Sequence, residues 1–210
     1  LVDLQSAFRK QNLDETARSS DLIDQDQLLA TGTGFYVNNN TIVTNSHVIN
    51  KCNSVSDKEQ NNYRILVNDR ANDVAILKSD GNSYDFLSLG KDPKLGENIF
   101  VAGYPLSGYL ESLNFTSGNV SSLIGLGQDI TQFQFTAPIQ PGNSGGPILN
   151  GIGVVTGITV ATASEVIEEV YGVMPQNINF GIKVGLLKQE LELNDINFYM
   201  NEEKATRFNK

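Results

Sequence analysis

The sequence predicts a mostly β protein built from two β units of similar size. Short runs rich in Val, Ile, Phe and Tyr alternate with Asn, Gly, Asp and Ser, which is the pattern of strands joined by turns. The pattern recurs in both halves, and 40% hydrophobic content over 210 residues is enough to form a core. Repeated short strands at this spacing are typical of sandwiches or closed barrels, because closure removes exposed strand edges.

An N-terminal arm with one helix is predicted for residues 1–27. The apolar residues of the arm are sparse and spaced roughly as on one helical face, at Leu1, Leu4, Phe8 and Leu13.

The first β unit is predicted to span residues 28–92. Its runs 28–37 and 41–48 are joined by three asparagines, which favour a hairpin, and the second of these strands carries His47. Two further strands are expected at 63–68 and 73–77, with Asp73 at the entrance of the latter. The pair Gly32 and Gly34 does not make a phosphate-binding loop, since the Gly-Lys-Ser/Thr ending and a following helix are missing.

The second β unit is predicted to span residues 93–193. Six short strands are expected in it, at 98–102, 118–123, 133–137, 148–149, 153–161 and 178–184. Apolar residues among Lys and Glu predict a closing helix over 183–193. Residues 194–210 have the composition of a C-terminal tail.

The composition excludes several classes of function. A formal net charge of −9 without a basic cluster makes nucleic acid an unfavourable partner. With one cysteine, Cys52, the chain forms no internal disulfide and no cysteine zinc site, and one histidine leaves little material for a transition-metal site. No apolar run reaches the roughly 18 to 20 residues of a membrane span. The chain begins with Leu1 and not Met, so its start is interpreted as trimmed.

Ser144 lies between glycines, after a Pro-Gly-Asn turn and before an apolar run. Glycines permit a tight turn and a close approach by another chain, so this serine is either a nucleophile held out toward a ligand or part of an ordinary strand connection. His47 alone and Asp73 alone are also compatible with structural roles. Together the three residues supply a hydroxyl nucleophile, an imidazole that takes its proton and a carboxylate that orients the imidazole.

Four blocks in this order resemble those of trypsin-like serine peptidases, and most closely the HtrA/Deg branch. They are residues 31–37 (TGTGFYV), 44–49 (TNSHVI), 72–77 (NDVAIL) and 142–147 (GNSGGP). Residues 101–105, 116–120 and 179–182 resemble further blocks of that branch, so the similarity covers about 28–191.

The resemblance implies two packed six-stranded antiparallel β-barrels, with His47 and Asp73 from the first and Ser144 from the second. By position, Ser144 is the nucleophile, His47 the general base and then acid, and Asp73 its orienting partner. The main-chain N–H groups of Gly142 and Ser144 would form the oxyanion hole. Asn143 stands where digestive peptidases have an aspartate for a newly cut N-terminus, so activation independent of such a terminus is expected.

The same alignment implies a pocket for the substrate residue before the cut, lined by Ile139, Gln140, Val160, Asn179 and Gly181. None of these residues is charged, which favours a small or medium aliphatic substrate residue. Each position is equally compatible with plain barrel core.

The function expected is a cofactor-free serine endopeptidase that cleaves unfolded or extended polypeptides through an acyl-enzyme. The alternative is a catalytically idle peptidase-like module that binds peptides. A Glu-selective peptidase is disfavoured, because such enzymes use an additional histidine in the pocket. The resemblance favours a periplasmic or secreted location, and this chain ends too soon to hold the PDZ domain usual in the branch. The sequence does not indicate an oligomeric state.

Overall fold

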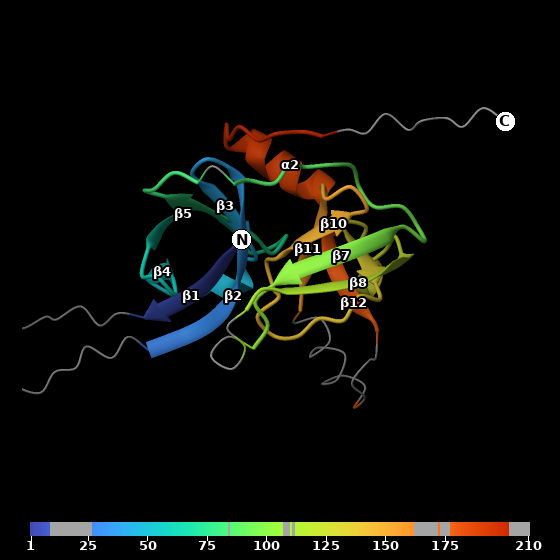
Figure 1. Ribbon diagram of the computed structural model, residues 1–210, viewed down its shortest axis with the longest axis horizontal. Coiled ribbons are helices and arrows are strands. Elements are labelled where there is room, and N and C mark those ends of the chain that lie inside the picture. Colours follow the sequence, from blue (N-terminus) through green and yellow to red (C-terminus); the bar gives the residue numbers. More distant parts are fainter. Residues whose placement is uncertain are drawn as a thin grey trace, which may run out of the picture.

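Two closed six-stranded antiparallel barrels make up the computed structural model, and they lie side by side in Figure 1. The structure describes residues 1–8, 27–83, 85–106, 110, 112–161, 172 and 177–201. The first barrel has the strand order β1-β2-β3-β6-β5-β4. Its strands are β1 Val2–Phe8, β2 Gln27–Asn38, β3 Thr41–Thr44, β4 Ser54–Asp57, β5 Asn62–Asp69 and β6 Val74–Ser79.

The second barrel has the strand order β10-β11-β12-β9-β8-β7. Its strands are β7 Asn98–Gly103, β8 Asn114–Ser122, β9 Gln132–Phe135, β10 Pro147–Asn150, β11 Val155–Val160 and β12 Asn179–Lys183. One 3-10 turn, η2 Leu126–Gln128, lies between β8 and β9. The two packed six-stranded barrels that the resemblance implies are confirmed, and so is the C-terminal helix that the apolar pattern predicts.

The N-terminal helix expected in the arm is wrong for residues 2–8, which form strand β1 of the first barrel. Val2, Asp3, Leu4 and Ser6 are buried, and β1 pairs with both β2 and β4. The spacing of Leu1, Leu4 and Phe8, which suggested one face of a helix, does not by itself exclude a strand. Pairing with a neighbouring strand on each edge favours the strand. Strand β1 therefore closes the first barrel and does not form an arm.

The predicted strand 41–48 would have carried His47, but in the structure His47 does not lie on a strand. Strand β3 ends at Thr44, and His47 begins the 3-10 turn η1 His47–Ile49. The Ser46 hydroxyl donates to Asn68 Oδ1 at 2.5 Å, which holds the chain as it leaves the sheet. Strand β4 lies between the expected strands 41–48 and 63–68, where the polar sequence indicates a loop, and only its Val55 is fully buried.

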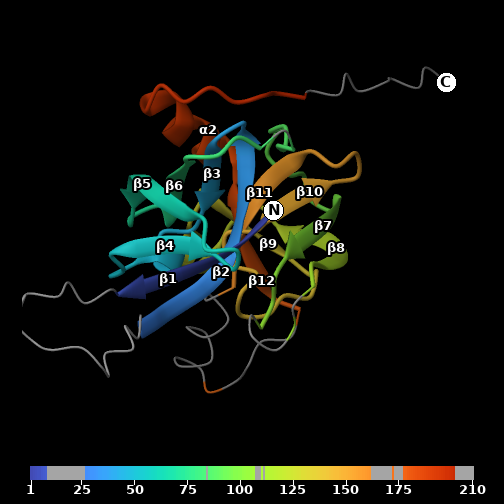
Figure 2. The same ribbon diagram turned by 60° about the vertical axis from the view of Figure 1, so that its left-hand side comes forward.

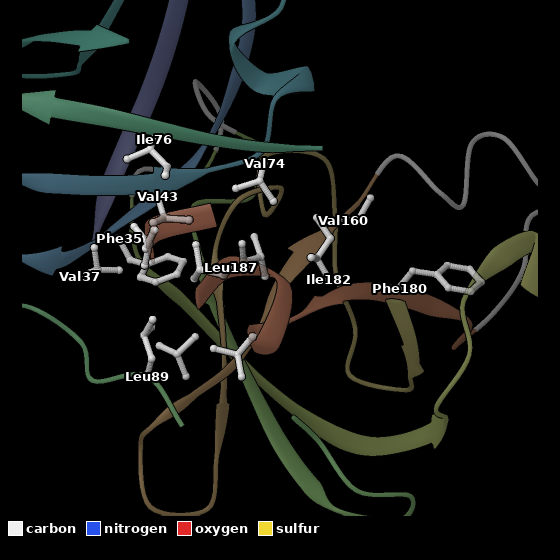
Figure 3. Packing of buried hydrophobic residues seen from close by; sticks show 14 residues of the cluster. Phe35, Val37, Val43, Val74, Ile76, Leu89, Val160, Phe180, Ile182 and Leu187 are labelled. Carbon is white, nitrogen blue, oxygen red and sulfur yellow. The ribbon is translucent and has the colours of Figure 1, made fainter. Parts of the chain in front are cut away.

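One hydrophobic cluster joins the two barrels (Figure 3). From the first barrel it takes Phe35, Val37, Val43, Val74 and Ile76, and from the second it takes Val155, Ile158, Val160, Phe180 and Ile182. A fully buried aliphatic or aromatic side chain contributes about 1.5–3 kcal/mol relative to an exposed one. This shared cluster packs the two barrels against each other and brings residues of both together at their junction.

The C-terminal helix α2 Val184–Leu193 matches the predicted closing helix and packs on the same cluster through Val184, Leu187 and Leu191. Figure 2 shows α2 at one end of both barrels. Residues 194–201 do not hang free as a tail, since Ile196 and Phe198 contact the cluster and the Tyr199 ring stacks on Phe86. Within the described residues, no helix has the length and apolar character needed to cross a membrane.

Candidate active site

Asp73 directly precedes strand β6 and has a left-handed backbone, with φ at +54°. Asp tolerates this conformation better than bulky residues do. The turn before it is held by Asp69, whose carboxylate accepts from the N–H groups of Ala71 and Asn72 at 2.9 and 3.2 Å. The Asn45 amide donates to the Asp73 carbonyl at 2.9 Å, so the backbone of Asp73 is fixed from the histidine segment.

His47 and Asp73 are in direct contact. His47 Nδ1 lies 2.8 Å from Asp73 Oδ2 and 3.0 Å from Oδ1, and the main-chain N–H of His47 also donates to Oδ1 at 2.9 Å. A carboxylate only accepts, so Nδ1 carries the ring proton in the neutral imidazole. The buried Nε2 then presents a lone pair, and it has no hydrogen-bond partner.

Ser144 is buried, with 4% of its surface exposed, at the point where the two barrels meet. Its carbonyl accepts from the N–H of Thr33 on β2 at 2.8 Å, and its Oγ accepts from the N–H of Ala161, which follows β11, at 3.2 Å. The structure thus places Ser144 between the two barrels. Among the described residues, no hydrogen bond joins Ser144 Oγ to His47 Nε2.

Gly145 brings the serine segment against the histidine segment. Its φ is +82°, and a Cβ built on it would overlap the Thr44 hydroxyl and the Thr33 carbonyl and lie 3.0 Å from the Asn45 nitrogen. Only glycine therefore fits, and the close approach puts Ser144 near the turn that leads to His47.

Residues 140–143 form a β-turn of the type II pattern. The Asn143 N–H donates to the Gln140 carbonyl at 3.0 Å, Pro141 occupies the second position, and Gly142 has φ at +98°. A type II turn requires a positive φ at its third position, which glycine supplies at no steric cost.

The direction of the Gly142 N–H follows from its neighbour. The Pro141 carbonyl accepts from the Leu106 N–H at 2.8 Å, and no peptide bond between described residues is cis. In a trans peptide the carbonyl and the N–H point in opposite directions, so the Gly142 N–H faces away from Leu106. In the described part of the chain, neither this N–H nor that of Ser144 donates to another group.

The five residues expected to line a pocket have different surroundings. Gln140 is exposed, and Ile139 is half-buried against a cluster of the second barrel. Val160 belongs to the cluster that joins the barrels, and the Asn179 amide donates to the Ala137 carbonyl at 2.8 Å. A Cβ on Gly181 would meet Ile148 and Phe133 of the barrel core.

Two carboxyl groups meet beside the turn that carries Asp73. Burial and then the nearby Asp69 carboxylate raise the pKa of Glu190 on α2 above its ordinary value. Burial opposes the shift of Asp69, but hydrogen bonds from Asn72 and Ala71 lower the pKa of that carboxyl. Burial also raises the pKa of Cys52, which makes its thiol a poor nucleophile at neutral pH.

Sequence reasoning missed two residues that hold the site, Thr33 and Asn45. Each lies in a block that resembles the peptidases, but nothing in the sequence alone shows which side chain reaches across the barrels. The acids Glu165, Glu168 and Glu169, whose sequence favours a solvated helical turn over a metal site, lie outside the described residues. Within the described ranges, no three His, Cys, Asp or Glu side chains are grouped to hold a metal ion.

Comparison with protein families finds a match between residues 32–158 and the trypsin-like peptidase domain. Among curated proteins, the uncharacterized protein y4bJ of Sinorhizobium fredii is 38% identical over 73% of this chain and 26% of its own length. Protease Do-like 2, chloroplastic, of Arabidopsis thaliana is 30% identical over 73% of this chain and 28% of its own length.

A probable periplasmic serine endoprotease, DegP-like, from Pseudomonas fluorescens is 33% identical over 64% of this chain and 30% of its own length. This chain therefore spans between a quarter and a third of these relatives. Among solved structures, the serine endoprotease from Yersinia pestis matches with a TM-score of 0.66 at 22% identity, over 92% of this chain and 62% of that one. That match supports the barrel fold.

Proposed function

Because the chain belongs to the trypsin-like peptidase family, in its HtrA/Deg branch, we propose that it is a serine endopeptidase that cleaves unfolded or extended polypeptides. The observation that carries the proposal is the His47–Asp73 contact, which leaves Nε2 with a free lone pair. Support for the role of Ser144 comes from Gly145, which lies against Thr44 and Asn45 in the segment that leads to His47. No cofactor is needed for this chemistry.

In the proposed mechanism, Ser144 Oγ attacks the carbonyl carbon of the scissile bond and His47 Nε2 takes the hydroxyl proton. The same proton then passes to the leaving amine as the C–N bond breaks, which leaves an ester on Ser144. A water molecule, deprotonated by His47, hydrolyses the ester. In the free chain Ser144 Oγ accepts from Ala161, so its own proton remains available to donate, and substrate binding must bring it onto Nε2.

The oxyanion that forms in each step would be held by the N–H groups of Gly142 and Ser144. Support comes from the turn that holds Gly142, because the Leu106–Pro141 hydrogen bond turns the Gly142 N–H away from Leu106 and neither donor is engaged elsewhere in the described structure. Such donors act mainly in the transition state, so their loss lowers kcat more than it raises KM.

Gly142→Ala should lower kcat by about 10² to 10³-fold, the effect of losing one oxyanion donor. A Cβ there would lie 2.5 Å from the Tyr104 carbonyl, and the positive φ disfavours alanine, so the turn must move. Gly153→Ala is the matched control, because Gly153 also has a positive φ but has no atom within 4 Å of the added carbon. Steady-state kinetics that gave both variants the same kcat would contradict the assignment.

The substrate residue before the cut is proposed to be small or medium and aliphatic, in a pocket formed by Ile139, Gln140, Val160, Asn179 and Gly181. The absence of charge in this set supports the proposal, since a buried basic side chain would require an acid partner. The Pseudomonas relatives are named as periplasmic, which supports a periplasmic or secreted location for this protein as well.

The test is digestion of one protein in two forms, native and permanently unfolded, followed by mass spectrometry of the fragments. The unfolded form should be cut, mainly after Val, Ala, Ile or Leu, and the native form should remain intact. The absence of fragments from both forms would favour the idle peptide-binding module. Cuts concentrated after charged residues would agree with the endopeptidase activity but contradict the proposed preference for aliphatic residues.

A further inference from the structure

Thr33 connects the first barrel to loops of the second through three hydrogen bonds, two of which go to the serine loop. It lies on β2, is fully buried, and donates its N–H to the Ser144 carbonyl at 2.8 Å. Its hydroxyl donates to the Gly142 carbonyl at 2.8 Å and accepts from the Tyr104 N–H at 2.9 Å. Both the donor and the acceptor of this hydroxyl are thus used by loops of the second barrel.

The β-turn of residues 140–143, here called the oxyanion turn, contains two peptides beside Gly142, and hydrogen bonds hold both of them. The peptide before Gly142 is held by the Leu106 N–H on the Pro141 carbonyl, and the peptide after it is held by the Thr33 hydroxyl. Leu106 has φ at +50°, an unfavourable conformation for leucine. The main chain is therefore strained at the residue whose N–H donates to Pro141. Since Thr33 also binds Tyr104, two residues before Leu106, both restraints on the turn meet at one hydroxyl.

We propose that Thr33 is a positioning residue of the peptidase, which acts through Gly142 to hold the oxyanion turn open for the tetrahedral intermediate. The inference rests on the proposed function. Loss of the hydroxyl leaves the buried Gly142 carbonyl without its donor and the Tyr104 N–H without its acceptor. A buried polar group without a partner favours rearrangement. Without the Thr33 hydroxyl, the Gly142–Asn143 peptide keeps only the hydrogen bond from the Asn143 N–H to the Gln140 carbonyl, so its carbonyl is the group that can turn.

The side chain of Thr33 allows its two roles to be separated. Its methyl group lies near Gly146, since a Cβ added to Gly146 would be 3.4 Å from it. Thr33→Val keeps the shape and the methyl group but removes the hydroxyl, whereas Thr33→Ser keeps the hydroxyl and removes the methyl group. Thr156→Val is the matched control, because Thr156 is equally buried and its hydroxyl donates to the Lys91 carbonyl at 2.7 Å, outside the serine loop.

The experiment measures kcat, KM and the affinity for a peptide boronate, which forms a tetrahedral adduct on serine. We expect Thr33→Val to lower kcat by about 10 to 100-fold with little change in KM, below the loss from removing a whole oxyanion donor. Affinity for the boronate should fall by the same factor. Thr33→Ser and Thr156→Val should behave like the wild type. A purely structural role would lower stability in both valine variants and leave kcat equal in them.

Two results would overturn the inference: equal kcat and boronate affinity in Thr33→Val and Thr156→Val, or a loss in Thr33→Ser as large as in Thr33→Val. If Thr33→Val does not fold, Thr33→Ala against Thr33→Ser repeats the comparison of one hydroxyl. Amide hydrogen exchange in residues 140–146 measures the order of the turn independently of catalysis. It should be faster in Thr33→Val or Thr33→Ala, and unchanged in Thr33→Ser. A wild type that neither cleaves nor binds the boronate, with slow exchange in this segment, would overturn the proposed function and keep the restraint on the turn.

Discussion

Replacing Ser144 by alanine is expected to abolish proteolysis. The substitution removes the hydroxyl that is proposed to form the ester. In serine peptidases the loss of the nucleophile costs on the order of 10⁶-fold in kcat. The measurement is the rate of cleavage of an unfolded protein by Ser144→Ala and by the wild type at equal concentration.

The matched control is Ser6→Ala. Ser6 is also a buried serine, and its hydroxyl donates to the Ala30 carbonyl in the first barrel. This variant loses one buried hydroxyl without touching the site, so it should keep wild-type activity. If Ser144→Ala cleaved the substrate as fast as Ser6→Ala, Ser144 could not be the nucleophile.

Asp73→Asn should lower kcat by about 10⁴-fold while leaving the fold intact. An amide can replace the carboxylate in two orientations. If its NH₂ group faces His47 Nδ1, the ring proton must move to Nε2, which then cannot accept a proton from Ser144. If the amide is turned, its NH₂ group faces the main-chain N–H of His47, which now donates to Asp73 Oδ1 at 2.9 Å. Two donors then oppose one another, so the first orientation is favoured.

Asp69→Asn is the control for this change, since it makes the same substitution four residues earlier in the same turn. Asp69 accepts from Ala71 and Asn72 and has no contact with the imidazole. Pre-steady-state kinetics should show slow acylation only in Asp73→Asn. Equal acylation rates in the two variants would mean that the carboxylate does not set the tautomer of His47.

Many of the strands were predictable because short apolar or alternating segments are bounded by turn residues. Strand β6 is buried at almost every position, and its predicted limits of 73–77 differ from the observed Val74–Ser79 by only one or two residues. Strand β1 was not predictable in the same way. Its buried residues include two polar ones, Asp3 and Ser6, and its partner strands lie far along the chain, so tertiary pairing and not local pattern determines it.

Part of the candidate site was also predictable. The order of His47, Asp73 and Ser144 and their surroundings predicted that they act together, and the structure brings the first two into contact. The orientation of the Gly142 N–H was not predictable, because it depends on Leu106 and Thr33, which are 36 and 109 residues away in sequence. Hydrogen bonds across two barrels leave no periodic signal.

The central claim is that Ser144 is a nucleophile activated by His47 and Asp73, and trapping with a serine-directed phosphonate tests it most directly. After incubation of the folded chain, intact-mass and peptide mass spectrometry should show one adduct per chain, on the peptide that contains Ser144. No adduct should form on Ser144→Ala, and formation should be slow on Asp73→Asn. An unmodified wild type, or an adduct on another serine, would contradict the account.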